Sequence, residues 1–232
     1  MSHWIELKAA DGHGFEAYVC EPQGQREGSG EGAGNGGSKG TVVLLQEIFG
    51  VNGHIQAVAK SFAEAGYHVI APSLMDRREP RLKLGYQPED VQRGLGITRS
   101  IAWDDVLKDV QAAVDRAPAG KVSVVGFCWG GSSAWFSAAR VTGLSAAVCY
   151  YGGSIPANAA LSPTVPVMMH WGEKDAIVPL EQARAVAAAH QDVEAHYYPA
   201  DHGFNCDQRA AFHAESARLA MRRTLDFLAR HG

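Results

Sequence analysis

KVSVVGFCWGGSSAWF, at residues 121–136, is the stretch that decides the fold. Its first half is rich in valine and nearly uncharged, which is typical of a strand buried on both faces. The residues after Gly131 space their apolar side chains as a helix does. A strand that turns through Gly126-Phe127-Cys128-Trp129-Gly130 into a helix predicts a parallel sheet with its chemistry at the strand ends.

The same alternation continues on both sides of this stretch. Further apolar runs predict buried strands at 41–46, 67–72, 144–152, 165–172 and 194–199. Amphipathic spacing predicts helices at 53–66, 100–118, 132–143, 179–191 and 208–232. Residues 3–20 alternate around Asp11-Gly12 and predict an antiparallel hairpin. The fold class is therefore α/β, a mostly parallel sheet with helices on both faces and an antiparallel N-terminal hairpin.

Length and composition favour one domain over residues 1–232. The chain is 46% hydrophobic, which is enough for one sizeable core. Residues 22–40 contain eight glycines and no aromatic or β-branched residue, and they lack the pattern of a phosphate-binding loop. We expect this segment to be a flexible Gly-rich surface loop, because it cannot bury enough surface to offset its ordering entropy.

The charge balance argues against several classes of partner. There are 21 Lys+Arg residues against 25 Asp+Glu, a net charge of -4, so no basic face for nucleic acid is expected. No apolar run approaches the roughly 18 residues of a membrane span. The start of the chain shows neither a basic leader nor an apolar stretch, which favours a cytoplasmic location. The sequence carries no indication of an oligomeric state.

Cys128 is the strongest candidate for a reactive residue. It stands between Gly126 and Gly130, whose missing Cβ atoms let the strand and the helix approach while the cysteine occupies a strained turn. The amino end of the following helix favours a thiolate. The structural alternative is a small buried hydrophobe, which is the expected role of Cys20 and Cys149.

A cysteine nucleophile needs a base and a group that orients it, and both follow in the expected chain order. Asp175 comes after the apolar run at 165–172, and the Pro179 bend after it should fix its position. Glu173 is a rival carboxylate, and an ordinary structural role in a turn is the alternative for Asp175. His202 comes after the run at 194–199. A metal site on Asp175, Asp201 and His202 is disfavoured, because no HExxH or paired histidine spacing accompanies them.

Glu47 is a carboxylate at the end of another buried run, TVVLLQE. It lies among Leu45, Ile48 and Phe49, where a charged group is costly unless a cation or donor is near. Most glutamates are exposed, so an exposed strand end is the structural alternative.

Four motifs together resemble the dienelactone hydrolase family of α/β-hydrolases: LLQEIFGVN, GFCWGG, WGEKDAIVP and DHGFN. The resemblance runs from about residue 41 to the end. It implies a triad of Cys128, Asp175 and His202, with Glu47 taking the thiol proton when substrate arrives. It also implies an oxyanion hole from the backbone N–H groups of Trp129 and Ile48.

The family also implies arginines that bind a substrate carboxylate. Arg77 matches one of them, although a solvated charge in a polar run is its structural alternative. A second family arginine follows the histidine by four residues, and that position here is Cys206. Arg209 and Arg81 are the residues that could substitute for it.

The predicted activity is hydrolysis of a lactone or ester through a thioester on Cys128, with a small-molecule substrate and with no metal or organic cofactor. A broad carboxylesterase or thioesterase, and a catalytically silent binding protein of the same fold, are the alternatives.

Overall fold

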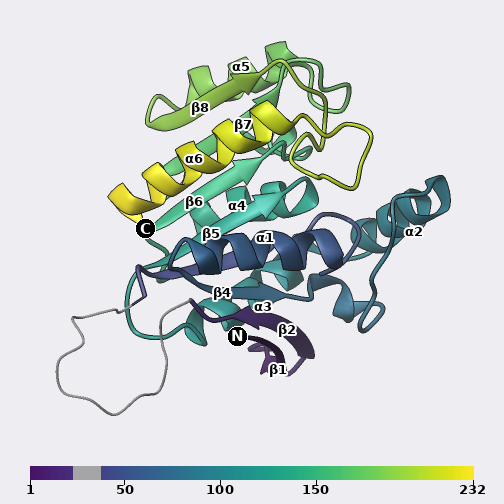
Figure 1. Cartoon of the computed structure of the whole chain (residues 1–232), viewed down its shortest axis with the longest axis vertical. Coiled ribbons are helices and arrows are strands. Elements are labelled where there is room, and N and C mark those ends of the chain that lie inside the picture. The colour runs from purple at the N-terminus through teal and green to yellow at the C-terminus, as the bar shows by residue number, and fades with distance from the viewer. Residues whose placement is uncertain (23–37) are drawn as a thin grey trace.

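The computed structural model describes residues 1–22 and 38–232, and its eight strands form one sheet (Figure 1). The strand order is β1-β2-β4-β3-β5-β6-β7-β8. The strands are β1 (Ser2–Lys8), β2 (Gly14–Cys20), β3 (Thr41–Leu45), β4 (His68–Pro72), β5 (Val122–Phe127), β6 (Ala146–Tyr150), β7 (Val167–Gly172) and β8 (Val193–Tyr198). β1 and β2 are antiparallel, as are β2 and β4, and the other neighbours run parallel. The predicted mostly parallel sheet and N-terminal hairpin are confirmed.

Helices cover both faces of the sheet. Those of the described residues are α1 (Gly53–Glu64), α2 (Pro88–Arg99), α3 (Trp103–Asp115), α4 (Trp129–Arg140), α5 (Leu180–Ala189) and α6 (Ala214–His231), with short 3₁₀ turns at Leu74–Arg77 and Pro156–Asn158. α1 and α6 lie on one face, where Phe62 and Phe227 belong to one apolar core (Figure 1). α3, α4 and α5 pack against the other core, which contains Trp135.

Three helix predictions differ from the structure. α2 was not predicted, because it carries two glycines and fully buries only Gly94 and Thr98, so its apolar pattern is weak. α4 begins at Trp129 rather than at residue 132, because the helix follows the elbow cysteine directly. α6 begins at Ala214 rather than at 208, because the His213 side chain accepts a hydrogen bond from the Ser216 amide and caps the helix there.

The predicted surface loop at 22–40 lies mostly outside the described residues, and the single-domain organisation stays a prediction. Within the part of the chain that the structure describes, no helix has the length and apolar character needed to cross a membrane.

Candidate active site

The turn between β5 and α4 holds Cys128 in a strained conformation. Its backbone has φ 55° and ψ -113°, a positive φ that non-glycine residues rarely adopt. A Cβ on Gly126 would lie 1.9 Å from the Gly130 carbonyl oxygen, and one on Gly130 would lie 2.3 Å from the Leu45 carbonyl oxygen. The predicted need for glycine at both positions is confirmed, because any side chain there would separate the strand from the helix.

Cys128, His202 and Asp175 form one line of contacts. The Cys128 Sγ lies 3.2 Å from the His202 Nε2, and the His202 Nδ1 lies 2.8 Å from the Asp175 Oδ2. His202 and Asp175 are buried, whereas Cys128 is partly exposed. The three strands that carry these residues end at the same edge of the sheet, which is why the tertiary fold brings together positions 74 and 27 residues apart.

Asp175 is held by the loop that follows β7. Its Oδ1 accepts hydrogen bonds from the backbone N–H groups of Ile177 at 2.7 Å and Val178 at 3.0 Å, which leaves Oδ2 directed at the histidine. Glu173, the rival carboxylate, is exposed. The geometry therefore selects Asp175 as the residue that orients His202.

His202 sits in an environment that favours its protonated form. Burial by itself would lower the pKa of His202, but the facing Cys128 sulfur and the bond to Asp175 outweigh burial and raise it to about 10. The Tyr151 ring packs edge-on against the imidazole, with 5.1 Å between ring centroids. A histidine held between the carboxylate and the sulfur can hold a proton in the site and return it.

Both ring nitrogens of His202 are engaged, by Asp175 and by Cys128. The neighbouring Asp201 is exposed, and it accepts a hydrogen bond from the His202 backbone amide. Among the residues that the structure describes, Asp175, Asp201 and His202 do not bring their ligand atoms to one common point.

Glu47 lies at the same level of the sheet as Cys128. β3 and β5 are paired with Leu45 opposite Gly126, and Glu47 and Cys128 each come two residues after these paired positions. The Glu47 side chain is 1% exposed, and its Oε1 accepts a hydrogen bond from the Arg209 Nη1 at 3.3 Å. The exposed-strand-end alternative is therefore wrong, and the required cation is Arg209.

Arg209, one of the two possible substitutes for the second arginine, is the cation beside Glu47. Burial would lower the pKa of Arg209, yet the neighbouring Glu47 and Cys128 raise it above its ordinary value. Its guanidinium lies 5.7 Å from the Phe49 ring centroid, a cation–π contact. Gly203, with φ 78°, leaves room for it, because a Cβ there would lie 2.3 Å from the Arg209 Nη1. Arg81, the other possible substitute, is 72% exposed and pairs with Glu16.

A largely apolar pocket opens in front of the Cys128 sulfur. Its wall includes Cys128, His202 and Arg209, the two expected oxyanion-hole residues, Trp129 and Ile48, and a further cation, Arg99. Other apolar side chains line it: Phe49, Val91, Leu95, Ile101, Trp103 and Ile177.

The unpredicted helix α2 contributes part of this wall through Val91, Leu95 and Arg99. Two features of the sequence could have revealed the helix start. Pro88 stands at the first helical position, and the capping box joins Gln87 to Asp90.

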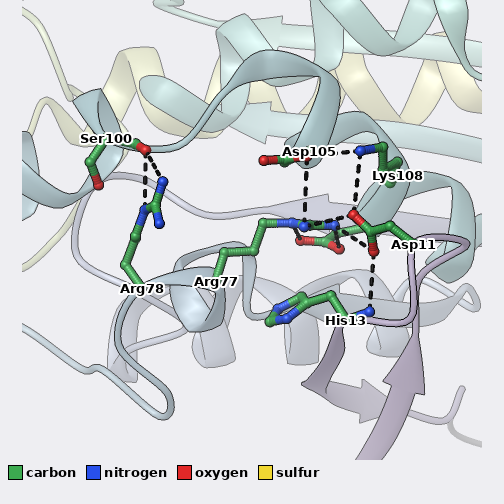
Figure 2. A network of polar contacts seen from close by, with 8 residues as sticks. Asp11, His13, Arg77, Arg78, Ser100, Asp105 and Lys108 are labelled. Carbon is green, nitrogen blue, oxygen red and sulfur yellow. Dashed lines mark hydrogen bonds and ion pairs between the residues drawn. The ribbon is translucent and has the colours of Figure 1, made fainter.

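Arg77 is not among the residues that line this pocket, and it lies in a network of polar contacts (Figure 2). Its guanidinium binds both oxygens of the buried Asp109, at 2.7 and 2.8 Å, and Asp11 at 2.9 Å. Asp105 lies 3.8 Å away and Lys108 also pairs with Asp11 (Figure 2). The structure therefore does not bring Arg77 together with the triad, and its contacts hold the N-terminal hairpin turn to α3.

Replacing Arg77 with methionine is expected to lower the free energy of unfolding by about 3 kcal/mol, because it leaves Asp109 buried without its cation. Burial already raises the pKa of Asp109 to about 6 despite Arg77, and loss of the arginine would raise it further. A raised carboxyl pKa contributes stability that disappears as the pH rises through it, so the loss should be larger at pH 8 than at pH 5. Urea unfolding measures both values.

Arg81→Met is the matched control for this prediction, since it removes an exposed ion pair worth about 1 kcal/mol or less. Equal losses for the two variants would contradict the structural role of Arg77.

The remaining cysteines are unpaired and buried. Cys20 and Cys149 lie within strands, as expected of small hydrophobes. Cys206 is 0% exposed, and burial raises the pKa of its thiol to about 11. Cys206 stands where the resemblance implies a second arginine, and Arg209, three residues later, lines the pocket.

Comparison with known proteins adds independent findings. A sequence model of the dienelactone hydrolase family matches residues 31–232. A protein of Yersinia pestis is 35% identical over 211 residues, which are 82% of this chain and 78% of that protein. Carboxymethylenebutenolidase 1 of Cupriavidus pinatubonensis is 29% identical over 99% of this chain and 97% of its own. A crystal structure from Klebsiella pneumoniae has a TM-score of 0.80 at 28% identity, with 100% of both chains covered.

Proposed function

The chain belongs to the dienelactone hydrolase family of α/β-hydrolases, and from this premise we propose that it opens lactones or esters through an acyl-enzyme on Cys128. The observation that carries the proposal is the alignment of the Cys128 Sγ with the His202 Nε2 at 3.2 Å and of the His202 Nδ1 with Asp175 at 2.8 Å. A nucleophile, a base and an orienting carboxylate within contact distance are the elements that covalent acyl transfer requires.

Acylation begins with removal of the thiol proton. We assign this step to Glu47 when substrate fills the pocket, because its Oε2 is buried and has no partner among the described residues. The Cys128 thiolate then attacks the carbonyl carbon, and the C–O bond to the leaving group breaks as the thioester forms. The alcohol or enolate departs with the proton that the thiol released.

The developing oxyanion needs donors that are already in place. We assign them to the backbone N–H groups of Trp129 and Ile48. Both residues line the pocket, and neither N–H has an acceptor among the hydrogen bonds of the described residues. The amino end of α4 adds its positive dipole at the same point.

Deacylation uses His202 as the base. Its Nε2 takes a proton from water, the hydroxide attacks the thioester carbonyl, and the acid leaves as the proton returns to sulfur. Intact-mass spectrometry after mixing with a slowly hydrolysed aryl ester tests the proposal. An acyl adduct that maps to Cys128 is expected, and turnover with no adduct at Cys128 under any quench condition would contradict it.

A broad carboxylesterase or thioesterase is the second candidate. It is favoured by the apolar lining of the pocket, which suits neutral acyl groups. The two candidates share their chemistry and differ only in how strongly the enzyme prefers a substrate that carries a carboxylate.

Arg209→Met tests that difference. We expect the ratio of kcat/KM for carboxylated over neutral substrates to fall about ten- to a hundredfold, because a charge-assisted bond to the substrate carboxylate is lost. Any effect on Glu47 should slow both substrates and cancel in the ratio. Arg77→Met, which removes an arginine outside the pocket, should leave the ratio unchanged.

A reversed result, with the ratio sensitive to Arg77 and not to Arg209, would restore Arg77 as the carboxylate-binding residue. A ratio insensitive to both would favour the general esterase. The cytoplasmic location, the independence from cofactors and the absence of a nucleic-acid partner stay predictions.

A further inference from the structure

Behind the catalytic pocket, three side chains of metal-binding type converge. Glu47, His54 and Cys206 each offer one ligand atom, and these atoms all lie within 4.8 Å of one another. Their side chains are buried, at 1%, 3% and 0% exposure. We call these three residues the buried triad.

Three separate parts of the chain build the buried triad. Glu47 follows β3, His54 lies in the first turn of α1, and Cys206 lies in the loop between β8 and α6. Because the three residues come from separate segments, only the tertiary fold brings their side chains together.

His54 is oriented as a metal ligand usually is. Its Nδ1 lies 3.1 Å from the Asp207 Oδ1, and Asp207 is 60% exposed. A carboxylate on one ring nitrogen fixes the tautomer and leaves the other nitrogen with its lone pair, which is the arrangement found around zinc-binding histidines.

Two ligand atoms of the buried triad have no partner. The Glu47 Oε2 and the His54 Nε2 are buried, and neither has a hydrogen-bond partner among the described residues. A buried polar atom without a partner is costly, and a bound ion or water would supply the missing partner. The Glu47 Oε1 is occupied by Arg209, so Oε2 is the carboxylate oxygen left for a ligand.

We propose that the buried triad is a binding site for Zn²⁺, through the Cys206 Sγ, the His54 Nε2 and the Glu47 Oε2. Sulfur, imidazole nitrogen and carboxylate oxygen together form a donor set that suits Zn²⁺ and does not suit Mg²⁺ or Ca²⁺. On binding, the Cys206 S–H bond is replaced by an S–Zn bond, and the proton leaves to solvent. With its Oε2 bound to the ion, Glu47 can no longer take the Cys128 proton. The bound ion should therefore inhibit hydrolysis, and this consequence rests on the role of Glu47 in the proposed function.

Isothermal titration calorimetry with Zn²⁺ tests the site. The titrations use Cys128→Ala as the background, because Cys128 and His202 could themselves bind the ion. We expect about one ion per chain with proton release, and no such binding when His54→Gln or Cys206→Ala is added. Asp207→Asn, an exposed change, should weaken binding by about ten- to a hundredfold.

His68→Gln is the matched control, since His68 also pairs with a carboxylate, Glu21 at 2.9 Å, but lies outside the buried triad. It should leave Zn²⁺ binding unchanged. Circular dichroism and thermal unfolding verify that each variant is folded. If a variant at His54 or Cys206 does not fold, the Asp207→Asn titration tests the site by itself, through the expected weakening of Zn²⁺ binding.

No binding in the Cys128→Ala background, or binding unchanged by His54→Gln, Cys206→Ala and Asp207→Asn, would overturn the site. Inhibition of otherwise unmodified enzyme by Zn²⁺ is measured separately and should weaken in His54→Gln. Calorimetric binding without this inhibition would leave the Zn²⁺ site standing and would instead contradict the role of Glu47 in the proposed function.

Discussion

Cys128→Ala is expected to lower kcat/KM by about five to six powers of ten, the effect seen when a covalent nucleophile is removed. The fold should survive, because alanine occupies less space than cysteine and introduces no β-branch at the strained turn with φ 55°. Steady-state hydrolysis of an aryl ester measures the loss, and thermal unfolding verifies the fold. A folded variant with more than a trace of activity would show that Cys128 is not the nucleophile.

Cys128→Ser separates the chemistry of the nucleophile from its position. Serine is nearly isosteric with cysteine, yet its hydroxyl is much less acidic, so the Glu47 and His202 bases should deprotonate it poorly. We expect a folded protein of very low activity. A fully active serine variant would mean that the site does not depend on a thiolate.

Glu47→Gln is expected to slow acylation by about two to four powers of ten, the usual contribution of a general base. Glutamine keeps the size of the side chain and can still accept the Arg209 hydrogen bond, so the change removes mainly the ability to take a proton. Single-turnover release of the aryl alcohol isolates this step, and KM should change much less than kcat.

Glu173→Gln is the control for Glu47→Gln, since Glu173 is an exposed glutamate that belongs neither to the catalytic triad of Cys128, His202 and Asp175 nor to the buried triad. It should acylate at the normal rate. If Glu47→Gln also acylates normally, then His202, 3.2 Å from the sulfur, removes the thiol proton alone and Glu47 is structural.

Much of the candidate site was predictable because its determinants are local. The elbow requires glycine on both sides of the nucleophile, and the steric contacts at Gly126 and Gly130 explain why the requirement is visible in sequence. Asp175 and His202 could be chosen because each follows a buried strand, and parallel strands end at one edge of the sheet. Asp175 was preferred over Glu173 because of the Pro179 bend that follows it, and the structure adds that Asp175 is buried whereas Glu173 is exposed.

The features missed in sequence have a weak local pattern or none. α2 carries two glycines and fully buries only Gly94 and Thr98, because its apolar side chains Val91 and Leu95 are shared between the core and the pocket wall, so its periodicity was too weak to predict it. The buried triad is invisible in sequence, since its three residues lie 7 to 159 positions apart and share no motif.

The sequence by itself determined the alternation of strands and helices, the elbow at Cys128 and the chain order of the triad, because each depends on side-chain pattern over a few residues. Only the tertiary structure decided which of Arg77 and Arg209 lines the pocket. Arg77 and Arg209 are both charged residues in polar runs, but Arg77 is neutralised by Asp109 and Asp11, whereas Arg209 pairs with Glu47 and lines the pocket. A charge acts through the groups within a few ångströms of it, and those groups come from distant parts of the chain.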